Sequence, residues 1–274
     1  MNIFTVLFTQ PLANGLIIFY KILGSNMGLA IIGFSLFLRI LLNPLTKPYM
    51  DSMKKMKDLA PQLEKLKKKY KGDKIKQAQA QADFYREKGI KPGAGCLPYL
   101  LQIVILIALF NVFNKTLIAN TNTKERFNEL LYSNLKFEEN AQINTKFLYL
   151  DVTKPDIIKI PAIPTALPGP ILVLAALAQF LSAKIMTPFE KAEENIAKKT
   201  KETSDDMQVA LQKSMTLTFP LFTLIIGMRF SSGLAIYWLI FSLSQFYQQY
   251  RTQGLGSLTP WLKKLNLLKS SSKE

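Results

Sequence analysis

The chain has 274 residues, of which 49% are hydrophobic, and carries a formal net charge of +16 at pH 7. It contains no histidine and one cysteine, which excludes histidine-based catalytic triads, zinc or haem bound by histidine, and any intrachain disulfide. The phosphate-binding patterns GxxxxGK(S/T) and GxGxxG do not occur, so we predict neither an enzyme nor a nucleotide-driven pump, and no cofactor.

The excess of basic residues is typical of nucleic-acid-binding proteins and of membrane proteins with basic cytoplasmic loops. Long apolar segments favour the second class. We therefore expect the lipid bilayer as a partner and no specific nucleic-acid sequence.

The first element in chain order is the apolar segment 1–24, which Pro11, Asn14 and Gly15 interrupt. No Lys or Arg precedes Lys21, whereas a secretory signal peptide begins with positive charge. We expect an amphipathic N-terminal helix that lies in the membrane interface.

Five apolar segments follow, and each has about the length that a transmembrane helix needs. They cover residues 28–46, 97–114, 168–187, 214–230 and 233–249. Only Ser231 and Ser232 separate the last two, which predicts a tight helical hairpin. The predicted fold class is all-α, a polytopic membrane protein with five transmembrane helices.

Loop charges predict the orientation in the membrane. Residues 47–96 carry 14 Lys and Arg, residues 184–213 carry 6, and the tail from Arg251 carries 5. These segments share one side and hold 25 basic residues, against 9 on the other side. Because basic loops stay in the cytoplasm, we predict an external N-terminus and a cytoplasmic C-terminus.

The basic segment 47–92 is predicted to form a cytoplasmic amphipathic helical hairpin. Apolar residues at three- or four-residue spacing mark one face of each arm. They are Met50, Met53, Met56, Leu59, Leu63, Leu66 and Tyr70 in the first arm, and Ile75, Ala78, Ala82 and Tyr85 in the second. This face is either a seam between the arms or an adaptable surface for varied apolar chains. The lysines form either a solvated face or a dock for anionic lipid, ribosomal RNA or an acidic substrate.

Three further segments connect or follow the predicted spans. Residues 115–165 form an extracytoplasmic loop with a short packed element at 147–151. Residues 188–213 form a solvated cytoplasmic loop, and residues 250–274 form a basic cytoplasmic tail that is either a solvated end or a ribosome contact.

Arg39 lies in the middle of the first span. At a rise of about 1.5 Å per residue it is about 16 Å from Gly28, near the centre of a hydrocarbon core of about 30 Å. An arginine there costs about 3 kcal/mol on insertion scales, and it does not lose its proton. Either Arg39 donates to carbonyls and glutamines and locks the bundle, or it is a fixed charge in a water-filled groove. The absence of Asp and Glu from all five spans favours the groove.

Other polar residues occur in the spans and require polar partners or water. Ser35 lies one turn before Arg39, Gln102 lies in the second span, Gln179 in the third and Trp238 in the fifth. The alternative for the glutamines is an interhelical hydrogen bond, and for Trp238 a place in the interfacial aromatic belt.

An ordered set of short motifs covers nearly the whole chain. It comprises GLAII (28–32), LR (38–39), NPLT (43–46), SMKKM (52–56), LEKL (63–66), GCLP (95–98), LQ (101–102), FLYLD (147–151), FP (219–220) and SGLAIYW (232–238). In order and spacing this set resembles the YidC-type membrane protein insertases, the bacterial branch of the Oxa superfamily.

The resemblance implies five core helices around a hydrophilic groove that opens to the cytoplasm and to lipid. It places Arg39, Ser35, Gln179 and Trp238 in that groove, and we add Gln102. It also implies that the hairpin 47–92 handles substrates. The expected cellular localisation of the protein is the bacterial inner membrane.

The resulting hypothesis is a membrane protein insertase and chaperone that needs no nucleotide hydrolysis. Its partners would be nascent membrane proteins and the bilayer, with the Sec translocon, the ribosome and the signal-recognition-particle receptor as further candidates. The alternatives are an ion or solute channel or transporter that uses Arg39 as a selectivity charge, and a structural assembly factor in which Arg39 is replaceable.

Overall fold

A computed structural model describes residues 2–70, 72–89, 97–117, 122–161, 164–200, 216–255 and 258–259. The chain forms two compact units. The first comprises Met1–Asn43, Tyr99–Ala178 and Pro220–Ser244, and the second comprises Pro44–Pro98, Gln179–Phe219 and Gln245–Glu274.

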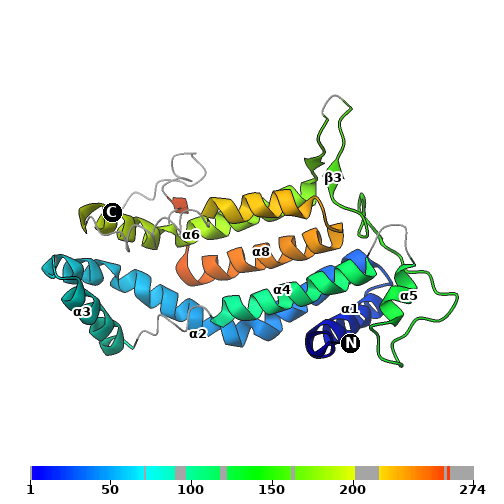
Figure 1. Cartoon of the computed structure of the whole chain (residues 1–274), viewed down its shortest axis with the longest axis horizontal. Coiled ribbons are helices and arrows are strands. Elements are labelled where there is room, and N and C mark those ends of the chain that lie inside the picture. Colours follow the sequence, from blue (N-terminus) through cyan, green and yellow to red (C-terminus); the bar gives the residue numbers. More distant parts are fainter. Residues whose placement is uncertain are drawn as a thin grey trace, which may run out of the picture. The chain divides into compact units, whose positions relative to one another are not determined.

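The chain is mostly helical, as predicted (Figure 1). The described helices are η1 (Thr5–Thr9), α1 (Gln10–Ile22), α2 (Met27–Lys69), α3 (Lys74–Glu87), α4 (Leu97–Thr116), α5 (Thr123–Asn128), α6 (Pro170–Thr200) and α8 (Ser232–Gln253). An apolar helical segment, Thr216–Gly227, precedes α8. The boundary between the two units falls within α2, α4, α6, α8 and the segment Thr216–Gly227.

Four two-residue strands, which the predicted all-α class omits, lie between α5 and α6. β1 (Lys146–Phe147) pairs antiparallel with β2 (Leu150–Asp151). β3 (Ile157–Ile158) pairs antiparallel with β4 (Leu167–Pro168). Two residues are too short a run for an alternating pattern to become visible in the sequence.

One helical segment in the described parts of the chain, Met27–Pro48, is long and apolar enough to cross a membrane by length and composition. It has 22 residues and contains Arg39. Leu101–Thr116, Pro170–Ile185 and Thr216–Gly227 are shorter apolar segments that lie within the predicted spans or overlap them. The fifth predicted span, 233–249, lies within α8.

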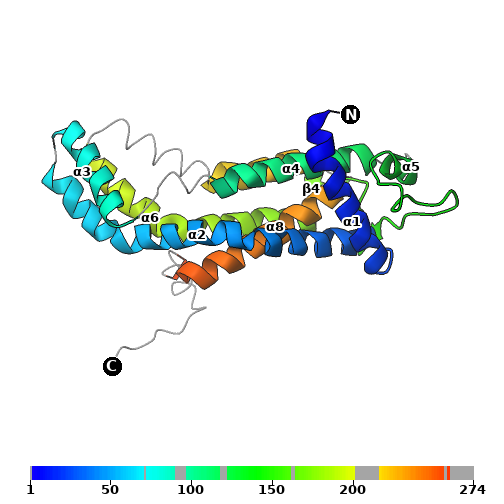
Figure 2. The ribbon, with the colours of Figure 1, turned by 90° about the horizontal axis from the view of Figure 1, so that it is seen from below.

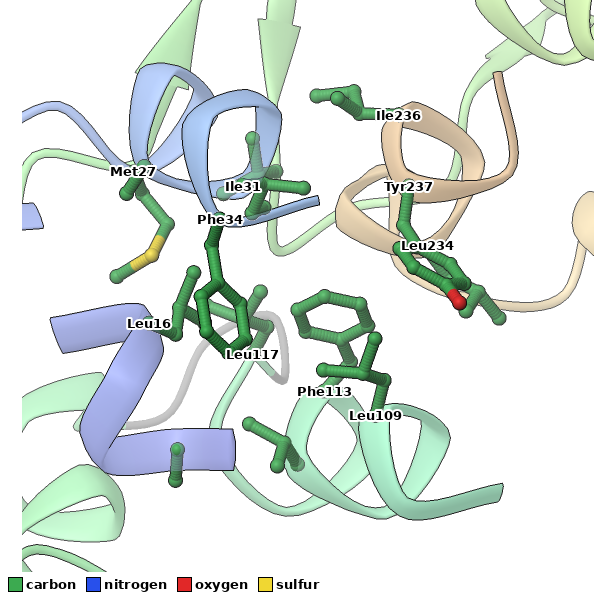
Figure 3. Packing of buried hydrophobic residues seen from close by; sticks show 14 of the residues in the cluster. Leu16, Met27, Ile31, Phe34, Leu109, Phe113, Leu117, Leu234, Ile236 and Tyr237 are labelled. Atoms are coloured by element: carbon green, nitrogen blue, oxygen red, sulfur yellow. The ribbon is translucent and has the colours of Figure 1, made fainter. Parts of the chain in front are cut away.

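The apolar core of the first unit joins α1, α2, α4 and α8. Figure 3 shows Leu16 of α1, Phe34 of α2, Phe113 of α4 and Leu234 of α8 converging on one another. Each is at most 5% exposed. Removing one large buried side chain of this kind costs about 2–5 kcal/mol, so this core fixes the helix that carries Arg39.

Helix α1 runs across the direction of α4 (Figure 2) and buries one face in this core. The amide nitrogen Nδ2 of Asn14 donates to the Leu130 carbonyl at 3.1 Å, and its Oδ1 accepts from the Tyr132 backbone N–H at 2.8 Å. A buried amide requires such partners, so these two bonds anchor α1 to the segment after α5. The opposite face exposes Ile18 and Ile22.

The start of α6 depends on the buried carboxylate of Asp156. Its Oδ2 accepts from the Leu172 backbone N–H at 2.8 Å, and its Oδ1 accepts from the Tyr149 hydroxyl at 3.0 Å. Desolvation raises the pKa of Tyr149 to about 12, so the hydroxyl stays a donor. A Cβ on Gly169 would lie 1.7 Å from Asp156 Oδ1, which explains glycine at this position.

In the second unit, the later part of α2 and α3 form a helical hairpin, as Figures 1 and 2 both show. Gly72 has a φ of 101°, and Asp73 caps α3 by accepting from the Lys76 backbone N–H at 3.0 Å. In the first arm, Met50 and Leu63 are buried.

Most of the apolar residues that mark the predicted face of the second arm are exposed. Ile75 is 80% exposed, Ala78 and Ala82 are exposed as well, and Gln77 is buried instead. Helix α3 is rich in Lys, Gln and Ala, so its sparse apolar residues define a face only weakly.

Candidate functional site

Arg39 is half-buried on the membrane-length part of α2. Its guanidinium carbon lies 5.0 Å from the ring centroid of Phe241 on α8. A cation over an aromatic face is stabilised by about 0.5–2 kcal/mol, and most when both groups are desolvated. The neighbouring residues Ile40 and Leu41 are 74% and 56% exposed, as expected for side chains that meet lipid. The aromatic contact therefore holds the charge on one side of an otherwise apolar helix.

Tyr237 and Gln102 extend this contact to a third helix. Gln102 Nε2 on α4 donates to the Tyr237 hydroxyl at 2.8 Å. The rings of Tyr237 and Phe241 lie 6.2 Å apart, centroid to centroid, at an interplanar angle of 28°. Tyr237 is 3% exposed, so its hydroxyl requires this partner.

Arg39, Phe241, Tyr237 and Gln102 form what we call the Arg39 cluster. Its members come from α2, α8 and α4 of the first unit. The cluster places a permanent positive charge, a phenol hydroxyl and an amide close together among apolar helices. Such a set can bind acidic or amide groups by charge and hydrogen bonding.

Ser35 lies on the same helix, one turn before Arg39, and is 6% exposed. Its hydroxyl donates to the Ile31 carbonyl at 2.5 Å. This bond satisfies the hydroxyl within α2 and leaves lone pairs of its oxygen as acceptors.

The remaining predicted residues are half-buried. Trp238 follows Tyr237 on α8 and packs against the apolar core of the first unit. Gln179 lies on α6 in the second unit. Among the five predicted residues, Arg39 and Gln102 are thus linked through aromatic side chains, and Ser35 and Trp238 lie on the helices that carry those contacts.

Sequence reasoning missed Tyr237 and Phe241 as site residues. Tyr237 falls inside the SGLAIYW motif. Phe241 lies four residues after Tyr237, so both lie on one helix face. That spacing was available in the sequence. However, an aromatic residue in an apolar helix usually packs in the core or meets lipid, which gave no reason to select these two.

The described part of the chain shows no ligand set for a metal ion. Among the described residues, no group of three or more His, Cys, Asp or Glu could hold a metal ion. What the cluster offers is charge and hydrogen bonding rather than metal coordination.

Comparison with known proteins adds independent information. Residues 18–256 match the model of the family described as 60Kd inner membrane protein. A protein of Fusobacterium nucleatum is 33% identical over 232 residues, which are 85% of this chain and 88% of the relative. It is named Membrane protein insertase YidC.

Two other relatives with the same name are longer. A Caulobacter vibrioides protein is 44% identical over 110 residues, which are 40% of this chain and 18% of the relative. A Leptospira interrogans protein is 28% identical over 253 residues, which are 90% of this chain and 35% of the relative. The chain therefore spans nearly all of one relative and a minor part of the other two.

Proposed function

Because the chain belongs to the 60Kd inner membrane protein family, whose relatives include YidC insertases, we propose that it inserts nascent membrane proteins into the bilayer and acts as their chaperone. The Arg39 cluster is the observation that carries this proposal. A permanent charge on a membrane-length helix is costly, and the core of the first unit holds it in place beside a tyrosine and a glutamine.

The proposed site of action is a hydrophilic groove among five transmembrane helices at 28–46, 97–114, 168–187, 214–230 and 233–249. Arg39, Ser35, Gln102, Gln179 and Trp238 would line it. The groove would open to the cytoplasm and to lipid, with the N-terminus outside and the C-terminus inside. The ratio of 25 to 9 basic residues between the two sides supports this orientation.

Insertion through such a groove needs no nucleotide hydrolysis. A substrate helix of about 20 residues gains about 0.3–0.6 kcal/mol per apolar residue on entering lipid. The barrier is the polar flank that must cross the membrane. A unit charge pair at 4 Å is worth about 4 kcal/mol at an effective dielectric constant near 20. Arg39 would thus hold an acidic flank briefly and still release it.

The hairpin at 47–92 would receive the substrate on the cytoplasmic side. Its exposed Ile75 and its lysines offer apolar and basic contacts together. The Sec translocon, the ribosome and the signal-recognition-particle receptor are the partners that we propose for this side of the membrane.

The test is insertion of two single-span substrates by the reconstituted full-length chain. The two substrates are identical except in their translocated tails. One tail carries Asp and Glu, and the other carries Asn and Gln at the same positions. We expect Arg39→Ala to lower insertion of the acidic-tailed substrate about tenfold or more, because the charge pair is lost. We expect a much smaller change for the neutral-tailed substrate.

Two further variants act as controls for this test. Arg39→Lys keeps the charge but not the planar guanidinium, so we expect it to retain part of the preference. Arg229→Ala removes an exposed arginine that follows the segment Thr216–Gly227, and we expect no change in either substrate. Insertion of both substrates at the wild-type rate by a folded Arg39→Ala chain would refute charge recruitment.

A further inference from the structure

A polar cavity of about 470 Å³ lies in the first unit, away from the Arg39 cluster. Its lining comes from η1 and the residues before it, from the end of α4, and from α5 and the turn after it. The lining residues are Asn2, Thr5, Lys115, Arg126, Glu129 and Leu130. Sites for small organic ligands have volumes of about 300–1,000 Å³, so this cavity has room for one polar group of that size.

The charges of the lining favour a singly negative ligand. Lys115 and Arg126 are cations, and Glu129 is the one acid in the lining, which gives a net charge of +1. Arg126 Nη1 donates to the Lys115 backbone carbonyl at 3.5 Å, which places the guanidinium beside the end of α4. The remaining guanidinium donors suit two oxygens of one phosphate group.

The walls of the cavity are held by hydrogen bonds on two sides. Thr5 is 5% exposed, and both its backbone N–H and its hydroxyl donate to Asn2 Oδ1, at 2.8 and 2.7 Å. On the other side, the Leu130 carbonyl accepts from buried Asn14 of α1. A site with fixed walls loses little conformational entropy when a ligand binds.

The segment that contributes Asn2 and Thr5 to the cavity also carries exposed apolar side chains. Within and next to η1, Ile3 is 79% exposed, Leu7 is 60% exposed and Val6 is 46% exposed. The segment thus presents apolar side chains on the same helix that contributes Thr5 to the cavity. A polar, cationic cavity next to exposed apolar side chains matches an amphiphile with an anionic headgroup and acyl chains.

We propose that this cavity binds the headgroup of an anionic phospholipid with a hydroxylated headgroup, such as phosphatidylglycerol. Arg126 and Lys115 bind the phosphodiester oxygens, and Glu129 accepts a hydrogen bond from a headgroup hydroxyl. The single negative charge of the phosphodiester then balances the lining. The site would fasten η1 and the crosswise helix α1 to the membrane interface (Figure 2). It depends on the membrane location of the family and not on insertase activity.

The experiment uses the purified, delipidated full-length chain in a neutral detergent, with binding followed by native mass spectrometry. The probes are short-chain phosphatidylglycerol, short-chain phosphatidylcholine and inorganic phosphate. We expect the tightest binding for phosphatidylglycerol. Equal binding of phosphatidylcholine would overturn the assignment to an anionic headgroup. Inorganic phosphate that binds as tightly as phosphatidylglycerol would overturn the assignment to a lipid.

Variants test the residues that line the cavity. The double variant Lys115→Gln/Arg126→Gln should lower the affinity for phosphatidylglycerol about tenfold or more, because charge-assisted hydrogen bonds are lost. The matched control Lys136→Gln/Lys146→Gln removes the same charge from exposed positions outside the cavity and should leave the affinity unchanged. Equal affinities for the two double variants would overturn the proposal.

A third variant keeps the test decisive if the double variant does not fold. Glu129→Gln raises the net charge of the lining from +1 to +2. It should therefore shift the preference towards phosphatidic acid, whose phosphomonoester carries more negative charge than a phosphodiester. An unchanged preference between the two lipids would show that Glu129 does not contact the headgroup, against the proposal.

Discussion

The two parts of α2 differ in how their side chains are covered. In the first unit, α2 buries Met27, Ala30, Ile31, Phe34 and Leu38 in a core to which α1, α4, α5, α6 and α8 also contribute. From Pro44 to Lys69, Met50 and Leu63 are the buried hydrophobic side chains among those that the structure describes. One part of the helix is fixed by packing, and the other keeps apolar and basic side chains available. This difference suits a rigidly held charge in the first unit and an adaptable hairpin in the second.

The largest loss of stability is expected when a buried side chain is removed from the core of the first unit. Phe127 of α5 is fully buried, so Phe127→Ala should lower the free energy of unfolding by about 3–5 kcal/mol. The measurement is denaturant or thermal unfolding of the full chain in detergent.

The matched change in the second unit is Ile75→Ala. Ile75 is 80% exposed, and the expected loss is within about 0.5 kcal/mol. Losses of similar size for Phe127→Ala and Ile75→Ala would show that the hairpin is packed as tightly as the first unit.

An effect no larger than that of Phe127→Ala is expected at the start of α6. Gly169→Ala would place a Cβ against the Asp156 carboxylate that holds the first turn, and we expect a loss of about 3 kcal/mol by thermal unfolding. Tyr149→Phe removes the hydrogen bond to the same carboxylate and the acceptor of the Ile171 backbone N–H, and should cost about 1–3 kcal/mol. An unchanged melting temperature for Gly169→Ala would mean that the segment from Asp156 to α6 can shift without loss of stability.

Sequence reasoning was most successful where apolar runs were long. The predicted span 28–46, with Arg39 in its middle, lies within the membrane-length segment Met27–Pro48, because the length and apolar composition of a span are local properties. Sequence reasoning did not select Phe241, since a cation–π contact between α2 and α8 depends on how the helices pack. It left open whether the apolar face of α3, which includes the exposed Ile75, is a seam or a free surface, because a helix of mostly polar residues carries a weak apolar period.

The most local expected effect concerns the cap of α3. Asp73 accepts from the Lys76 backbone N–H and lies 3.1 Å from Lys76 Nζ. The backbone hydrogen bond and then the side-chain contact lower the pKa of Asp73 below 3.8. Asp73→Ala should speed hydrogen exchange of amides in the first turn of α3 a few-fold, because an N-cap bond is lost. Exchange in α1 should stay unchanged, since this helix belongs to the first unit.

The pH dependence of the difference in hydrogen exchange between the wild-type and Asp73→Ala chains separates loss of the cap from a general loss of charge. A carboxylate with a lowered pKa stabilises the folded form above the unfolded pKa, and this contribution disappears as the pH falls through the folded pKa. The wild-type and Asp73→Ala chains should therefore differ at pH 6 and converge as the pH falls through the lowered pKa of Asp73. Asp83→Ala is the matched control, because Asp83 is an exposed acid within α3 that pairs with Arg86 at 3.8 Å. If both variants change exchange equally, the N-cap makes no special contribution and the hairpin is held by its turn and its few buried side chains alone.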